Sequence, residues 1–144
     1  MSAGGFLNDI ANCSYESKVS DCGYAFKIVK SYLSNYETSS VAYDMTMYVC
    51  LSMFAGDYSL SGKEATFMND FLGQRFEHGY LVDEYKSMRN QGYKKVYSYL
   101  SKAPLDIRKH CAIMAACCLS CDRVITSDEV DFYQSFLELL DLSV

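Results

Sequence analysis

Two acidic segments carry the side chains of this chain that are best suited to chemistry. The first runs Asp57-Tyr-Ser-Leu-Ser-Gly-Lys-Glu64, and the second runs Asp122-Arg-Val-Ile-Thr-Ser-Asp-Glu129. Each segment places an Asp, an aliphatic residue, a hydroxyl residue and a Glu at the same spacing. Carboxylate oxygens are ligands that Ca²⁺ and Mg²⁺ prefer in proteins. The pattern therefore makes Asp57, Glu64, Asp122 and Glu129 candidate ligands of a divalent cation.

A structural role competes with metal binding for the two glutamates. Ser61 with Glu64, and Thr126 with Glu129, each form a Ser/Thr-x-x-Glu capping box. In such a box the hydroxyl accepts from the backbone N–H of the Glu, and the carboxylate accepts from the backbone of the cap. The box explains the glutamates as helix caps. It leaves the two aspartates open between an Asx-turn and a cation site.

The spacing excludes a calcium loop of the EF-hand type. That loop needs a Glu at its twelfth position. Counting from Asp57 places Met68 there, and counting from Asp122 places Tyr133 there.

Helices must position both acidic segments. The runs 45–54 and 111–121 are apolar on almost every side, which is typical of buried helices. Other stretches show apolar residues at helical spacing on one face only. We therefore expect one all-α domain over residues 20–144, a bundle of about seven helices, after a weakly structured segment over residues 1–19. The helices expected from these patterns cover residues 21–35, 41–55, 62–72, 81–90, 93–102, 104–121 and a last stretch after the Thr126 cap.

The two acidic segments belong to a longer internal repeat. Residues of similar type recur at a constant separation of 65 positions, and a similar apolar helix precedes each segment. Such self-similarity predicts two similar helical hairpins, with the apolar helices packed together at the centre and the amphipathic helices outside. The matching pairs are Asp57 and Asp122, Leu60 and Ile125, Ser61 and Thr126, Glu64 and Glu129, Phe67 and Phe132, and Phe71 and Phe136.

These features together resemble the tellurite-resistance TerB-like family. The matching residues are Ala55-Gly-Asp57-Tyr-Ser-Leu-Ser61-Gly-Lys-Glu64 and Cys121-Asp122-Arg-Val-Ile-Thr126-Ser-Asp128-Glu129. The resemblance implies a bundle of about seven helices and a non-enzymatic role in stress-response or phage-defence assemblies. It also implies membrane association only through partners, and candidate cation binding by the acidic residues. Tyr58 and Arg123 stand where the family has glycine, so the chain would be a divergent member.

Basic residues gather in one part of the chain. Residues 75–109 hold eight of the thirteen Lys and Arg residues. Within the 86–102 segment they alternate with tyrosines, and Tyr and Arg are favoured at protein interfaces. Two interpretations stay open, a partner-binding face and a solvated face with core tyrosines. The candidate partner-binding residues are Tyr93, Lys94, Lys95, Tyr97 and Lys102.

The seven cysteines predict buried thiols rather than a redox or zinc site. Cys118 and Cys121 form a CxxC at the end of a predicted helix, whereas redox pairs use a helix N-terminus. His110, Cys117 and Cys121 share a helix face, but His110 is too distant along the helix to join the other two on one zinc.

Composition restricts the remaining classes of function. The net charge of −5 argues against general affinity for nucleic acid, which needs a basic surface. The N-terminus lacks a basic and apolar leader pattern, and no apolar run approaches the ~20 residues that span a bilayer. With its odd number of cysteines, the chain is expected to be cytoplasmic, with no transmembrane segment.

The leading hypothesis is a non-enzymatic TerB-like module that binds a protein partner, with a candidate Ca²⁺ or Mg²⁺ site and with homo-oligomerisation left open. Two alternatives remain. One is a small enzyme that uses paired carboxylates, although no catalytic motif is present. The other is an adaptor that binds nucleic acid, or a phage or host protein, through the 86–102 face.

Overall fold

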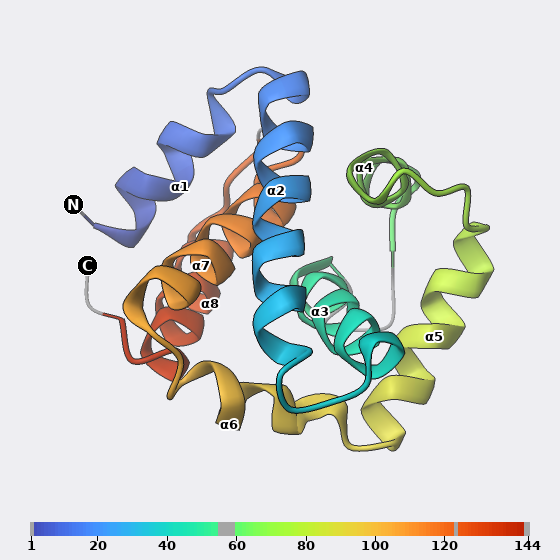
Figure 1. The fold of residues 1–144 in the computed structure, drawn as a ribbon. Coiled ribbons are helices and arrows are strands. Elements are labelled where there is room, and N and C mark those ends of the chain that lie inside the picture. Colours follow the sequence, from blue (N-terminus) through green and yellow to red (C-terminus); the bar gives the residue numbers. More distant parts are fainter. Residues whose placement is uncertain (1, 55–59, 123, 143–144) are drawn as a thin grey trace.

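The computed structural model describes residues 2–54, 60–122 and 124–142, and every regular element among them is a helix (Figure 1). This confirms the predicted all-α class. Within these ranges there are eight α-helices and one 3-10 turn, where the sequence predicts about seven helices. They are α1 (Ala3–Ala11), α2 (Tyr15–Leu33), α3 (Ser39–Phe54), α4 (Gly62–Leu72), α5 (His78–Asn90), η1 (Tyr93–Lys95), α6 (Val96–Leu100), α7 (Leu105–Leu119) and α8 (Ser127–Leu139).

Helices α2, α3 and α7 form the centre of the domain. Helix α2 packs extensively along α7 and also contacts α3, and α3 contacts α7. Figure 1 shows α2 running across α7 and α3. Ten of the sixteen residues of α3 are buried, which confirms that this helix is covered on most sides. A helix that is apolar all round gains most from such a position, because each face then leaves water.

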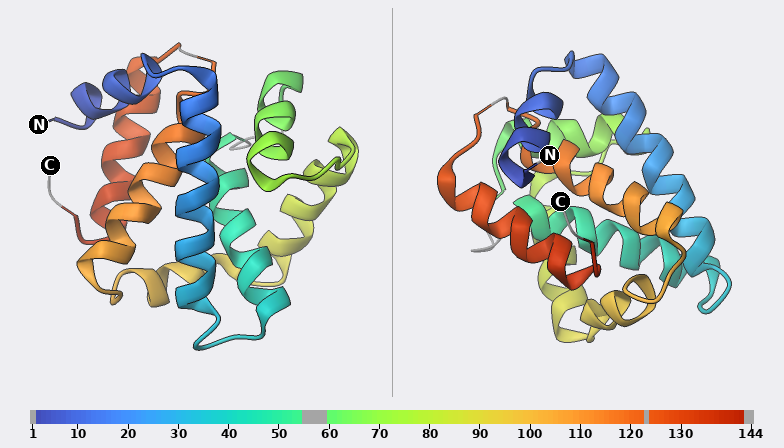
Figure 2. Two further views of the ribbon diagram at one scale, coloured as in Figure 1. Left: turned by 45° about the horizontal axis from the view of Figure 1, so that its top comes forward. Right: turned by 90° about the vertical axis from the view of Figure 1, so that its left-hand side faces the viewer.

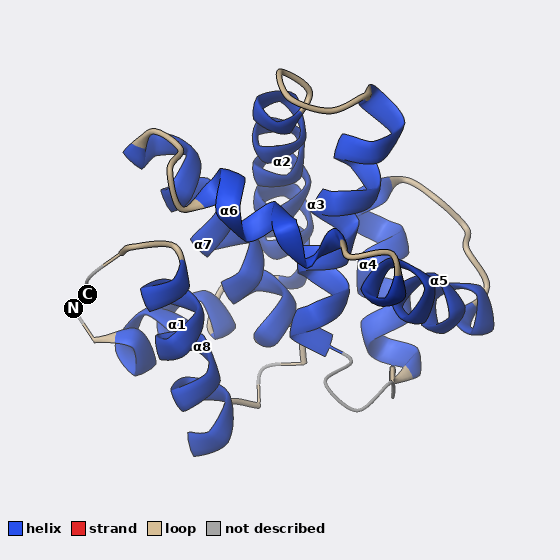
Figure 3. Cartoon of the chain, turned by 90° about the horizontal axis from the view of Figure 1, so that it is seen from below, coloured by secondary structure: helices blue, strands red, loops and turns tan. Residues whose placement is uncertain are grey.

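The other helices cover this centre on two sides. Helices α1 and α8 pack against α7 and each other, whereas α4 packs against α2, α5 and α7, and α5 packs against α3. Figure 2 shows α1 and α8 on one side of α7, with α4 and α5 beyond α2 on the other. Helix α6 and the turn η1 connect the two sides, as seen from below in Figure 3. None of the helices in the described ranges is both long and apolar enough to cross a bilayer.

The N-terminal segment differs from the sequence prediction. Residues 1–19 are expected to be weakly structured, yet α1 forms there and α2 begins already at Tyr15. Two serine caps start these helices: Ser2 Oγ accepts from Gly5 N at 3.0 Å, and Ser14 Oγ accepts from Ser17 N at 3.1 Å. The adjacent glycines Gly4 and Gly5 lower intrinsic helix propensity. Packing of α1 on α7 and α8 compensates for that weakness.

The expected arrangement of two hairpins is met in part. Helices α3 and α7 touch at the centre, as expected. Helix α2, however, packs along both of them and becomes the most central element. Helix α8 packs on α7, whereas α4 packs on α2 and α5 as well as on α7. The internal repeat therefore stays a prediction.

Candidate functional site

Both predicted capping boxes are present. At α4, Glu64 N donates to Ser61 Oγ at 3.1 Å, and Ser61 N donates to Glu64 Oε1 at 2.8 Å. At α8, Glu129 N donates to Thr126 Oγ1 at 3.2 Å, and Thr126 N donates to Glu129 Oε1 at 3.1 Å. Each box satisfies two backbone donors that a helix start otherwise leaves unpaired. The two glutamates thus have a structural role at the starts of their helices.

The structure describes only one of the two aspartates of the acidic segments, Asp122. Asp122 forms an Asx-turn, because Val124 N donates to Asp122 Oδ1 at 3.1 Å. This turn lies just beyond the end of α7 and turns the chain towards α8. Asp57 lies outside the described residues, so its predicted place in a cation site stays a prediction.

The two acidic segments come close together in space. Burial raises the pKa of the Glu64 carboxyl, and the negative charges of Asp122 and Glu129 raise it further, against hydrogen bonds from Ser61 that lower it. Three of the four predicted acidic ligands therefore lie near one another, close to the starts of α4 and α8. We call Glu64, Asp122 and Glu129 the acidic junction.

A buried lysine lies next to the acidic junction. Lys18 of α2 is only 1% exposed. Its Nζ donates to Ala11 O at 3.1 Å and to Ser120 O at 2.9 Å, which are carbonyls at the ends of α1 and α7. A cation stabilises a helix C-terminus, where the carbonyl dipoles are negative. Lys18 of α2 therefore connects the C-terminal ends of α1 and α7 through hydrogen bonds.

Lys18 also lines a cavity of about 390 Å³, which Asp122 of the acidic junction lines as well. The remaining lining comes from Tyr15 of α2, from the start of α4, and from Cys121 and Asp122 after α7. In the part of the chain that the structure describes, no three His, Cys, Asp or Glu side chains are placed to hold a common ion. The three described residues of the predicted cation site are thus acidic but do not by themselves form a ligand set.

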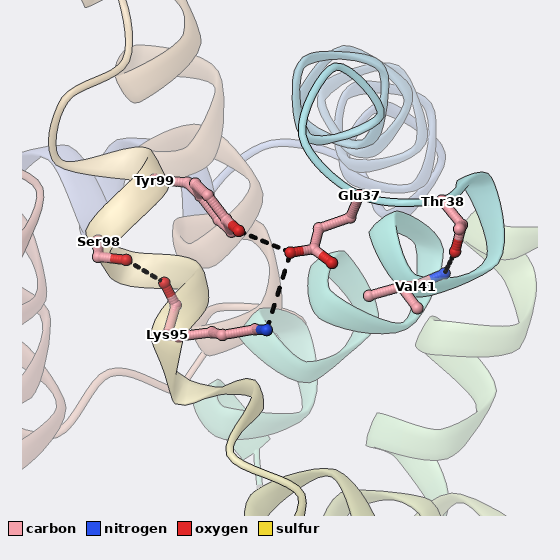
Figure 4. A network of polar contacts seen from close by, with 6 residues as sticks. All are labelled: Glu37, Thr38, Val41, Lys95, Ser98 and Tyr99. Carbon is pink, nitrogen blue, oxygen red and sulfur yellow. Dashed lines mark hydrogen bonds and ion pairs between the residues drawn. The ribbon is translucent and has the colours of Figure 1, made fainter.

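The predicted partner-binding residues fall on two different faces. Figure 4 shows Lys95 and Tyr99 directed towards Glu37 in the loop between α2 and α3. Tyr99 Oη donates to Glu37 Oε2 at 2.6 Å, and Lys95 Nζ lies 3.8 Å from the same oxygen. Lys102 is exposed on this side too, beside Tyr99.

Tyr93 is half-buried against the core, and burial and the nearby charges of Asp44, Glu84 and Glu37 raise its pKa. The surface around this part of the 86–102 segment is therefore mixed in charge rather than uniformly basic. A mixed face gives no support to a nucleic-acid interface.

Lys94 and Tyr97 face the opposite way, into an open groove of about 520 Å³. Its floor is mostly apolar and aromatic, and the stacked rings of Tyr48 and Tyr85 lie 5.6 Å apart along it. We call this feature the basic aromatic groove. It is lined by Tyr48, Ser52 and Met53 of α3, Tyr85 and Arg89 of α5, Lys94 and Tyr97 of η1 and α6, and Phe132, Ser135, Phe136 and Leu139 of α8.

Helix α8 leaves large apolar side chains uncovered in this groove. Phe132 is 45% exposed and Leu139 is 48% exposed. They flank Phe136, which is buried and meets the Tyr97 ring edge-on at 6.0 Å. The 86–102 segment alone could not reveal the groove, because most of its lining comes from other helices.

A pair of carboxylates with raised pKa values lies elsewhere. Burial raises the pKa of Asp44 in α3, and burial together with the charge of Asp44 raises the pKa of Glu84 in α5. Neither residue lines the groove or the cavity beside Lys18. The paired-carboxylate enzyme hypothesis expects such a pair inside a pocket, so this arrangement gives it no support.

The cysteines carry free thiols, and five of the seven are buried. Burial raises the pKa of Cys22 and of Cys118, which lie in the core between the central helices. Neutral thiols in such surroundings behave as small apolar residues.

Comparisons with known proteins identify no relative. No family model matches the chain, and no curated protein and no solved structure matches it.

Proposed function

We propose that the protein is a non-enzymatic, TerB-like helical module that binds another protein through the basic aromatic groove. The observation that carries this proposal is the exposure of Phe132 and Leu139, two turns apart on one face of α8, along one open groove. Contiguous apolar surface with a polar rim is typical of interaction sites on soluble domains. Tyrosine and arginine, which also line this groove, are enriched in protein interfaces.

The position of Phe132 in the predicted repeat supports the same proposal. Its counterpart, Phe67, is fully buried. The ring of Tyr15 from α2 meets Phe67 edge-on at 5.8 Å. Phe132 occupies the matching position of α8 but remains nearly half exposed. A docked partner would cover Phe132 as α2 covers Phe67.

Charge defines the kind of partner that the groove would accept. Arg89 and Lys94 line it in a chain whose net charge is −5. We expect the partner to present apolar side chains together with carboxylates, because complementary charges guide association and orientation.

Affinity capture with matched variants tests this proposal. The tagged protein captures partners from an extract of the cells that produce it, in wild-type form and as Phe132→Ser or Leu139→Ser. The control is Tyr24→Ser, which removes another exposed ring outside the groove. We expect one captured protein to be lost from both groove variants and retained by the control. Equal capture by all four proteins would contradict the proposal.

A second candidate function is divalent-cation binding at the acidic junction. The specific observation in its favour is that Asp122 and Glu129 lie close enough to Glu64 for their negative charges to raise the pKa of its carboxyl. A bound Ca²⁺ or Mg²⁺ would relieve the repulsion among these carboxylates and hold the starts of α4 and α8 together.

Isothermal titration calorimetry with CaCl₂ and with MgCl₂ tests the cation site. We expect binding by wild type, and weaker binding by Glu64→Gln, Asp122→Asn and Asp57→Ala. The control is Asp106→Asn at the opposite end of α7 from Asp122. Absence of heat in wild type, or equal loss in the control, would contradict the site.

We also propose a cytoplasmic location. The seven free thiols support a reducing compartment.

A further inference from the structure

The outer face of α8 combines apolar and acidic side chains. Phe132 and Leu139 are exposed on it, one turn to either side of Ser135 and Phe136. Asp131 and Glu138 directly precede these two apolar residues and are exposed as well. One residue corresponds to about 100° around the helix axis. The two carboxylates therefore lie beside the apolar residues, on the edge of α8 that points away from the core.

The basic aromatic groove continues this pattern on its other side. Arg89 and Lys94 line the groove from α5 and η1, whereas Phe132 and Leu139 line it from α8. Across the surface the order is thus basic wall, apolar floor and acidic edge. A strip with this order matches itself when it is turned by 180°, because the basic wall of one copy then faces the acidic edge of the other.

We propose that the groove is a self-association surface, in which a second copy of this chain places its α8 across the groove in a twofold dimer. A twofold interface uses the same patch on both subunits, so the patch must be self-complementary. In this dimer, Phe132 and Leu139 of each subunit leave water together, and Lys94 of each subunit faces Asp131 of the other. The inference rests on the proposed role of the groove as a protein-binding site and names its occupant.

Sedimentation equilibrium of the purified full chain over a range of concentrations tests the dimer. We expect the wild-type mass to rise from that of a monomer to that of a dimer as concentration increases. In a dimer of K94E, the new glutamate of each subunit faces Asp131 of the other. In a dimer of D131K, the new lysine of each subunit faces Lys94 of the other. Each variant therefore brings like charges together at both contacts of the dimer. Both are therefore expected to weaken association at least tenfold. Both residues are exposed, and circular dichroism shows whether the variants keep the wild-type helix content.

Mixing the two variants gives the sharpest result. In a mixed dimer of K94E with D131K, both contacts again join opposite charges, so the mixture is expected to regain wild-type association. The control K102E makes the same charge change on an exposed residue outside the groove, and it should associate like wild type.

Two results would overturn the inference. One is a wild-type protein that stays monomeric at every concentration. The other is a mixture that associates no better than either variant alone. A monomeric wild type would leave the groove to a different protein, which the capture experiment with Phe132→Ser detects independently.

Discussion

Replacing Lys18 with methionine removes the buried charge that connects three helices. Methionine keeps the apolar stem and similar volume but cannot donate to Ala11 O or Ser120 O. These two carbonyls, at the ends of α1 and α7, would each lose a bond of about 3 Å. The substitution therefore tests whether these two hydrogen bonds stabilise the fold, or whether packing of the helix ends is sufficient without them.

The expected cost follows from the two lost acceptors. A buried polar group left without its partner costs about 1–3 kcal/mol, so two carbonyls give roughly 2–6 kcal/mol. Methionine avoids the cost of burying an ammonium group, which offsets part of this loss. We expect Lys18→Met to lower the free energy of unfolding by about 2–4 kcal/mol, a large fraction of the ~5–15 kcal/mol typical of a domain.

Urea denaturation followed by circular dichroism measures this change at pH 7. Lys27→Met, on an exposed position of the same helix, is the matched control and should change the free energy by less than ~0.5 kcal/mol. If Lys18→Met is as stable as the control, or more stable than wild type, the two hydrogen bonds do not stabilise the helix ends.

Three further predictions concern the helix starts and ends. Ser61→Ala and Thr126→Ala should each lower the free energy of unfolding by about 1 kcal/mol, because each removes a side-chain cap; unchanged urea midpoints would contradict this. Glu64→Gln keeps a residue that can complete the capping box, but it removes the Glu64 carboxyl, whose pKa is raised in the folded state. The folded protein binds that proton more tightly, so wild type loses stability as pH rises through the raised pKa, and the variant should be more stable than wild type at pH 7 but not at pH 3. A pH-independent difference would contradict the raised pKa of Glu64. Gly73→Ala should cost about 1 kcal/mol, since Gly73 ends α4 with φ of 65°, and a variant with the wild-type urea midpoint would be inconsistent with that conformation.

The sequence predicts the parts of this fold that depend on neighbours along the chain. The capping boxes at Ser61 and Thr126 are present because each needs only two residues three positions apart. The burial of α3 is likewise predictable, since a helix that is apolar on every side has no face suited to water.

The sequence does not predict features that depend on which helices meet. Lys18 lies four residues before Cys22 on the buried stripe of α2, and this spacing is the one available signal for its burial. The two carbonyls that it binds come from other helices, however. The sequence does not predict the groove for the same reason, because Lys94 and Phe132 line it from elements far apart in the chain.

The pattern of alternating Tyr and Lys in the 86–102 segment predicts one partner face, but the chain turns between neighbouring residues. Lys94 lines the groove, whereas Lys95 pairs with Glu37 on the other side. A 3-10 turn and a short helix place adjacent side chains in different directions, which a tally of composition cannot detect.

Photo-crosslinking from the groove shows whether a protein docks on Phe132. A photoreactive benzoylphenylalanine replaces Phe132 in one protein and Tyr24 in another, and both are irradiated under the conditions in which the protein is produced. Both rings are exposed, but only Phe132 lines the groove. We expect a discrete protein adduct from position 132, identified by mass spectrometry as a second copy or another protein, and none from position 24. No adduct at position 132, or the same adduct from both positions, would contradict it.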